Sequence, residues 1–151
     1  MEDIRGEFAF KLLKVVTEQF AVYEENKIDT NDLSKLEMVV RFRFGVKPRT
    51  SIAAFALFEL QYDKNIVVTI ESGLYMELSG AAWEDMQVKK DKYKLEKEYA
   101  QHFAGMALGI TRGILHSKTE NTYLNQYPIP LIDASLYIPE DIEFDSMSHL
   151  N

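Results

Sequence analysis

The chain has 151 residues, the usual size of one domain, and its 46% hydrophobic and 27% charged content is ordinary for a soluble globular protein. It contains no cysteine, which excludes disulfides and zinc–thiolate sites and fits a reducing compartment. A net charge of −7 repels phosphate backbones on average, so we expect no nucleic acid as the main partner.

Targeting and membrane signals are not expected. The opening stretch MEDIRGEF is acidic and has no apolar core, unlike a secretory signal. The longest apolar run, Ile52 to Phe58, is far shorter than the roughly 20 residues of a membrane helix. We therefore expect one cytoplasmic domain over residues 1–151, without membrane insertion.

The first predicted element is a strand that starts near Phe8. Apolar and polar residues alternate there, as in a half-buried strand. The alternation breaks at Leu12-Leu13 and at Val15-Val16 and resumes through Phe20, which predicts a β-bulge. The polar stretch Glu24 to Lys35 that follows predicts a long connection, and loops of that length are often functional.

Three more strands follow. Residues 38–44 place Met38, Val40, Phe42 and Phe44 on one face, with Arg41 and Arg43 on the other. Residues 52–62 are apolar on both faces over most of their length and predict a central strand, and residues 66–78 place six apolar side chains on one face. Asp63-Lys64-Asn65 has the composition of a hairpin turn. Gly73 lies inside the last strand and predicts a second bulge or a bend.

The second half changes to helical periodicity. No proline interrupts residues 81–115, and helix formers dominate. Two stripes run along this segment: an apolar one (Tyr99, Phe103, Met106, Ile110, Ile114) and a glycine one (Gly105, Gly109, Gly113). Each glycine costs a helix up to about 1 kcal/mol relative to alanine, so we expect another backbone close by, from the sheet or from the same helix of a second subunit.

The C-terminal part begins with a helix stop. Prolines in Tyr127-Pro128-Ile129-Pro130 end any helix, and a short apolar segment follows, Leu131 to Ile138. The tail from about residue 139 has four acidic residues and no lysine or arginine. We expect this tail to be mobile.

Catalytic and metal signatures are missing from the sequence. The spacing of His102, His116 and His149 matches no metal motif, and the glycine stripe is GxxxGxxxG rather than a phosphate-binding GxGxxG. Paired carboxylates lie in predicted loops or the tail, where water keeps them ionised. We therefore expect no enzyme, no metal site and no cofactor.

Several segments together resemble the SecB family of export chaperones. FKLLKVVTEQFAVYEEN (residues 10–26) looks like the bulged first strand of that family and its exit into a long crossover loop. Ile110-Thr111-Arg112-Gly113 looks like the end of the family's long helix, and residues 130–137 (PLIDASLY) resemble the proline-led start of its last helix. The similarity covers residues 8–138.

The resemblance implies an α+β fold: a four-stranded antiparallel Greek-key sheet with a long helix and a shorter C-terminal helix on one face. It also implies an ATP-independent chaperone that binds unfolded or extended polypeptides in apolar grooves, as a homotetramer in which the long helices meet. By position, the peptide-binding residues would be Phe20, Val22, Leu33, Leu36, Phe42, Tyr127, Ile129, Leu136 and Tyr137. The oligomer interface would comprise Gly105, Gly109, Gly113, Met106 and Ile110.

The role within the family stays open. The stretch Ile114 to Gln126 is longer than the turn usual in the family, and the acidic tail differs from the one that family members present to the translocation ATPase. A chaperone of one client, such as the antitoxin of a toxin–antitoxin pair, is therefore an alternative. A structural adaptor with the same fold, and an enzyme or small-ligand domain with a dispersed site, are two others.

Overall fold

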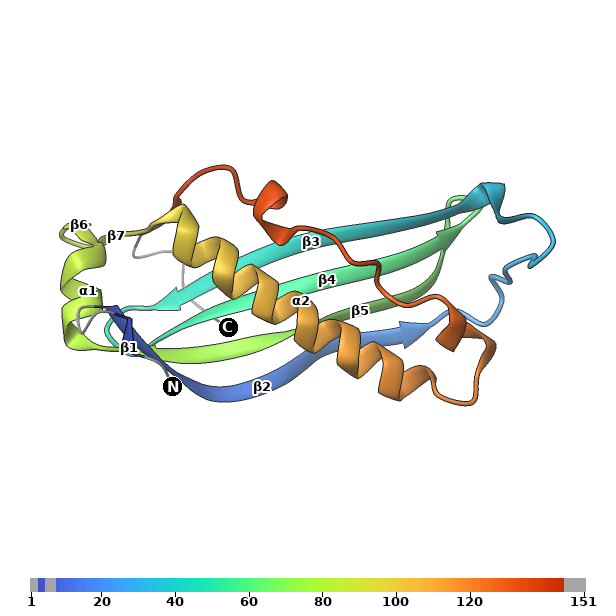
Figure 1. Cartoon of the computed structure of the whole chain (residues 1–151), viewed down its shortest axis with the longest axis horizontal. Coiled ribbons are helices and arrows are strands. Elements are labelled where there is room, and N and C mark those ends of the chain that lie inside the picture. Colours follow the sequence, from blue (N-terminus) through green and yellow to red (C-terminus); the bar gives the residue numbers. More distant parts are fainter. Residues whose placement is uncertain (1–2, 5–7, 146–151) are drawn as a thin grey trace.

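The computed structural model describes residues 3–4 and 8–145 and has a mixed α+β fold (Figure 1). One antiparallel sheet dominates it, and a long and a short α-helix accompany the sheet. The strands of this sheet are β1 (Asp3–Ile4), β2 (Phe8–Val22), β3 (Leu36–Lys47), β4 (Ser51–Tyr62) and β5 (Asn65–Leu78).

The sheet has the strand order β1-β2-β5-β4-β3, with β1 paired only to the start of β2. The strands β3, β4 and β5 follow one another through short turns, whereas β2 reaches β3 through a long crossover that ends in the 3₁₀ turn η1 (Leu33–Lys35). The predicted bulge in the first strand is confirmed, because the register between β2 and β5 shifts between Leu12 and Lys14 and again between Thr17 and Gln19.

The predicted hairpin turn is also confirmed, since Asp63 and Lys64 both have positive φ angles, 49° and 66°. The bulge predicted as one possibility at Gly73 is wrong, because both ladders pass through Gly73 without a register shift. A Cβ at Gly73 would lie 2.0 Å from the Ala54 carbonyl oxygen and 2.8 Å from atoms of Phe55. This glycine therefore permits close strand packing.

The helical half is divided. The short helix α1 (Gly80–Met86) is followed by a hairpin, β6 (Gln87–Lys89) and β7 (Lys92–Leu95), before the long helix α2 (Lys97–Thr119). The helix-forming composition of residues 81–115 therefore does not produce one continuous helix. Buried Tyr93 and Leu95 alternate with exposed lysines there, a period of two that the charge pattern conceals.

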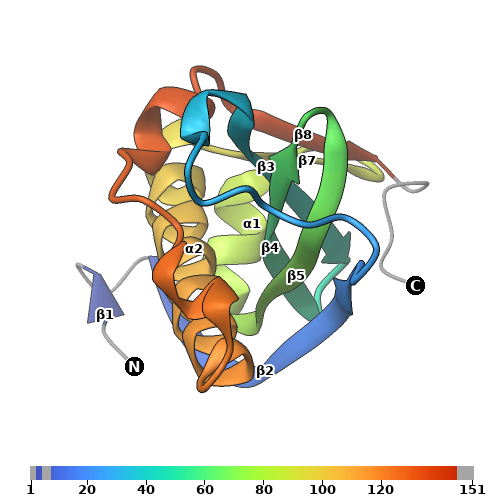
Figure 2. The same cartoon turned by 90° about the vertical axis from the view of Figure 1, so that its right-hand side faces the viewer.

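Helix α2 packs on one face of the sheet, over β4 and β5 (Figures 1 and 2). Small residues meet at this contact: Ala54 and Ala56 on β4, and Ala104 and Ala107 on α2, all buried. The buried hydroxyl of Thr111 donates to the Ala107 carbonyl at 2.8 Å and lies 3.1 Å from the Ser72 carbonyl, which ties the helix to the sheet. Neither α1 nor α2 is long and apolar enough to cross a membrane.

The region after α2 differs from the predicted short C-terminal helix. It contains two 3₁₀ turns, η2 (Tyr123–Gln126) and η3 (Ala134–Tyr137), joined by irregular backbone. The flanking prolines explain the difference, since they disfavour a continuous helix.

Part of the tail predicted to be mobile is an ordered strand. β8 (Ile142–Asp145) pairs antiparallel with β7, and Phe144 is buried. Alternation of Ile142 and Phe144 with acidic residues suits a half-buried strand. Residues 146–151 lie outside the described part of the chain.

Candidate functional site

The two flanks of α2 differ in what covers them. On the β2 flank, an apolar groove of about 500 Å³ runs between the helix and the sheet. We call it the β2 groove, and it is lined by Phe10, Leu12, Leu74, Met76, Met106, Gly109 and Ile110.

The β2 groove is open because α2 lies over β4 and β5 and leaves the middle of β2 uncovered. Toward the two ends of β2, Phe10 packs against Phe103 of α2 at 5.2 Å, and Lys118 of α2 lies over the ring of Phe20. Leu12 is 53% exposed, and Val15, the next inward-facing residue along β2, is 46% exposed. Their cross-strand partners on β5, Met76 and Leu74, are buried. The groove therefore has a buried floor and an exposed apolar rim.

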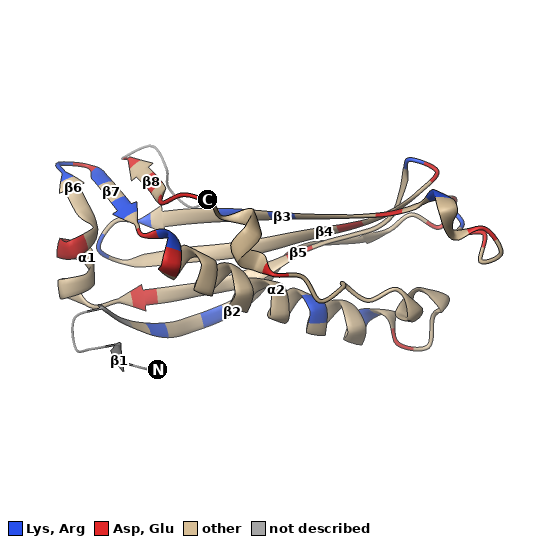
Figure 3. Ribbon diagram, turned by 45° about the horizontal axis from the view of Figure 1, so that its top comes forward, with Lys and Arg blue, Asp and Glu red and all other residues tan. Residues whose placement is uncertain are grey.

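No charged side chain belongs to the lining of this groove. Between residues 99 and 111, α2 carries no lysine, arginine, aspartate or glutamate. Figure 3 shows the charged residues of α2 near its ends, with an uncharged middle. A surface of this kind attracts apolar groups without directional selectivity.

The glycine stripe lies on the solvent side of α2. Gly105, Gly109 and Gly113 are all exposed, and a Cβ on any of them would meet no atom within 4 Å. The sheet, one of the two backbones expected to approach these glycines, is therefore not their neighbour.

The other flank of α2, toward β3, is covered by residues 127–141, which we call the strap. The strap runs between α2 and β3 (Figure 1) and buries Tyr127, Ile129, Ala134 and Ile138 in the main core. At its end, a carboxylate oxygen of Asp141 accepts a hydrogen bond of 2.8 Å from the backbone N–H of Lys97, the first residue of α2.

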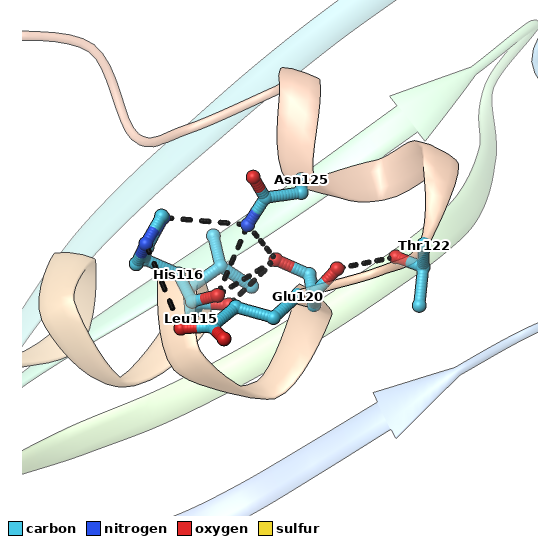
Figure 4. A network of polar contacts seen from close by, with 6 residues as sticks. Leu115, His116, Glu120, Thr122 and Asn125 are labelled. Carbon is cyan, nitrogen blue, oxygen red and sulfur yellow. Dashed lines mark hydrogen bonds and ion pairs between the residues drawn. The ribbon is translucent and has the colours of Figure 1, made fainter.

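A polar network fixes the point at which the chain leaves α2 (Figure 4). The side-chain amide of Asn125 donates to the carbonyl of His116 at 3.0 Å and to the Thr119 hydroxyl at 3.2 Å. The Thr119 hydroxyl donates to the Leu115 carbonyl, and the Thr122 hydroxyl donates to the Thr119 carbonyl, each at 2.7 Å. These bonds satisfy carbonyl groups that the end of a helix leaves free, so the network has a structural role.

The nine residues predicted to bind peptides fall into separate places. Tyr127 and Ile129 are buried in the core, so they are not accessible to a ligand while the strap is in place. Phe42 and Tyr137 pack edge to face at 5.6 Å on the β3 flank, next to exposed Leu136. Of the other four, Phe20 and Val22 lie on β2, Leu33 lies in the turn η1, and Leu36 is the first residue of β3.

Of the residues predicted to form the oligomer interface, Met106, Gly109 and Ile110 also line the β2 groove. Phe10, Leu12, Leu74 and Met76, which also line the groove, were not predicted from the sequence as site residues. Their alternation was the available signal, but it equally predicts ordinary core positions. Only the placement of α2 determines which of these apolar residues are buried in the core and which form the exposed rim of the groove.

Perturbed carboxyl groups occur at the 3₁₀ turns. At the start of η1, the hydroxyl and the backbone N–H of Ser34 hydrogen-bond to Asp32 and lower its pKa. Ser135 lowers the pKa of Asp133 in the same way at the start of η3. Burial, and then the charges of Asp32 and Asp29, raise the pKa of Tyr62. Each shift has a local structural cause.

Within residues 3–4 and 8–145, no group of three or more histidine, aspartate or glutamate side chains is arranged to hold a metal ion. No protein-family model matches the chain, and no curated protein matches it.

Proposed function

We propose that this protein is a SecB-like, ATP-independent chaperone that binds unfolded or extended polypeptide segments in the cytoplasm. The observation that carries the proposal is the β2 groove, an uncharged apolar channel with an exposed rim. Apolar grooves suit clients of unspecified sequence, because burial of apolar surface is non-directional.

The topology supports the same proposal. The strands lie in the order β2-β5-β4-β3, with three of them joined by short turns and the fourth by a long crossover. This order is compatible with the Greek-key sheet that the proposal requires. The long crossover and a helix on one face are the features that the resemblance to the SecB family implies. Fold likeness alone does not establish a function, so the groove carries the argument.

Self-association is part of the proposal. The exposed glycine stripe of α2 lets a second helix approach closely, because no side chain stands between the two backbones. A homotetramer with helices in contact would present several grooves to one client chain. Several weak sites then hold a long chain through effective concentration.

A capture assay tests the proposal. A labelled, permanently unfolded protein is titrated with the full chain without nucleotide, and native mass is recorded in the same samples. We expect micromolar or tighter binding by an oligomer and suppressed aggregation of the client. Absence of capture at several client ratios would contradict the proposal.

Leu12→Glu and Leu13→Glu form a matched pair for this assay. Both leucines are exposed on β2, at 53% and 46%, but Leu13 lies at the bulge and does not line the groove. We expect Leu12→Glu to weaken capture at least about tenfold, since a charge enters an apolar site. Leu13→Glu should bind like the wild type. Equal losses in both would place the client elsewhere.

The alternatives differ in what they capture. A chaperone for one client, such as an antitoxin, would bind that client and ignore unrelated unfolded chains. A translocation ATPase would co-purify with an export chaperone. A structural adaptor would bind only a folded partner and would be insensitive to Leu12→Glu.

A further inference from the structure

The strap lies against the rest of the molecule as a bound peptide would. Ile129 is 2% exposed and Ile138 is buried, whereas Leu131 and Leu136 are 92% and 78% exposed. The strap thus inserts some apolar side chains between α2 and β3 and leaves others in solvent. Two of its backbone stretches, 127–133 and 138–141, have no helix or strand structure.

Side chains of α2 hold the backbone of the strap. Arg112 donates from Nε to the carbonyl of Ile129 at 3.0 Å and from a terminal nitrogen to the carbonyl of Pro130 at 2.8 Å. Eleven residues earlier on the helix, Gln101 donates to the carbonyl of Ile138 at 2.9 Å. All three acceptors are main-chain carbonyls, so these donors would hold any polypeptide placed there.

We infer that the channel between α2 and β3 is a second polypeptide-binding site, which the strap occupies in cis. Its ligand is an apolar segment of another chain. Two apolar side chains of this segment would occupy the positions of Ile129 and Ile138, and its main-chain carbonyls would accept hydrogen bonds from Arg112 and Gln101. Binding requires the strap to leave. This site is distinct from the β2 groove, and the inference does not depend on the chaperone proposal.

The ends of the strap allow such an exchange. Before it, the Asn125 network holds the exit from α2, and after it, β8 pairs with β7. Release of the segment between these two points would leave the ladders of the main sheet intact. Occupation in cis lowers the apparent affinity for an outside segment by the fraction of time that the channel is free.

A labelled peptide with the sequence of residues 127–141 tests the inference against the full-length chain. Ile129→Ala weakens the packing of the strap but leaves the residues of α2 and β3 that line the channel unchanged. Because the loss of a buried isoleucine is costly, we expect this variant to bind the peptide at least about tenfold more tightly than the wild type does. Leu131→Ala is the matched control, two residues away and exposed, and should bind within about twofold of the wild type.

Two more variants locate the bound peptide. Arg112→Ala, added to Ile129→Ala, should lose at least about tenfold in peptide affinity, because the peptide carbonyls lose their charged donor. Leu12→Glu, added to the same background, should leave the affinity unchanged, since Leu12 belongs to the other flank. Loss of binding with Leu12→Glu would place the peptide in the β2 groove and overturn the inference.

Far-UV circular dichroism and a cooperative melt establish that each variant is folded. If Ile129→Ala does not fold, Asp141→Ala replaces it, since it removes the hydrogen bond from Lys97 and the ion pair with Lys94 at the end of the strap but no core side chain. An affinity no higher than that of the wild type in the folded, strap-weakened variant would overturn the inference. Failure to capture unfolded clients in the first assay would affect only the chaperone proposal.

Discussion

The two flanks of α2 present similar chemistry and reach opposite outcomes. Toward β3, the strap covers the apolar inner face of the sheet, and half-buried Phe42 packs against Tyr137. Toward β2, no described segment has the same role, and Leu12 and Val15 stay exposed at about half of their surface. Composition along a strand therefore does not determine whether its inner face is core or binding surface. The deciding factor is whether the chain has another segment to cover it.

Because of this difference, truncating an apolar side chain should lower the free energy of unfolding by different amounts on the two flanks. A residue that the strap buries contributes to folding, whereas a residue on the open rim adds little to folding and is available to a partner. The comparison can therefore be tested by stability measurements without any ligand.

The largest expected effect comes from truncating an apolar side chain on each flank. Ile129→Ala should lower the free energy of unfolding by about 2–5 kcal/mol, since it leaves a cavity in the core. Leu12→Ala should cost less than about 1 kcal/mol, because much of that side chain is already in water. Urea denaturation of both variants measures the difference. Equal costs would mean that the β2 flank is covered in solution, for which a second copy of the chain is the first candidate.

An effect of intermediate size is expected at the glycine stripe. Gly105→Ala, Gly109→Ala and Gly113→Ala should each stabilise an isolated subunit by up to about 1 kcal/mol, because alanine favours the helix and its Cβ would meet open space. If a second helix packs on the stripe, the triple variant should instead lose oligomer mass in native mass spectrometry. Stabilisation with unchanged oligomeric mass would remove the stripe from the interface.

Much of the sheet could be predicted from the sequence, because alternation, bulges and turns are local properties of the chain. The bulge after Leu12 and the turn at Asp63 are examples. The role of Gly73 was missed, since its constraint comes from Ala54 and Phe55 on the neighbouring strand. The β7 strand was missed because lysines occupy its exposed positions and give the stretch the composition of a solvated helix.

The candidate sites were less predictable than the fold. Ile129 and Leu136 belong to one short apolar segment, yet one is buried and the other is 78% exposed. No sequence period separates them, because the strap has no regular structure to impose one. The path of the strap instead depends on residues of α2: Arg112 holds the backbone at Ile129, and Gln101 holds it at Ile138.

The smallest expected effect is a difference between the two flanks in how their local stability depends on pH. Two hydrogen bonds from Ser135 lower the pKa of Asp133, in the strap, from its ordinary value of 3.8; the bond from the hydroxyl has the larger effect and the bond from the backbone N–H the smaller. A depressed folded-state pKa contributes stability above the unfolded value, and this contribution is lost as the pH falls through the folded value. The protection factors of amides in the strap, which correct for the intrinsic pH dependence of exchange, should therefore fall in that acid range, while those along β2 should not share this dependence. Ser135→Ala should raise the pKa of Asp133 toward 3.8 in a carboxyl NMR titration, and Ser34→Ala, the matched change at Asp32 outside the strap, should leave Asp133 unchanged. A wild-type Asp133 that titrates at 3.8 would show that its bonds to Ser135 do not persist in solution, and the strap would then have no acid sensitivity of its own.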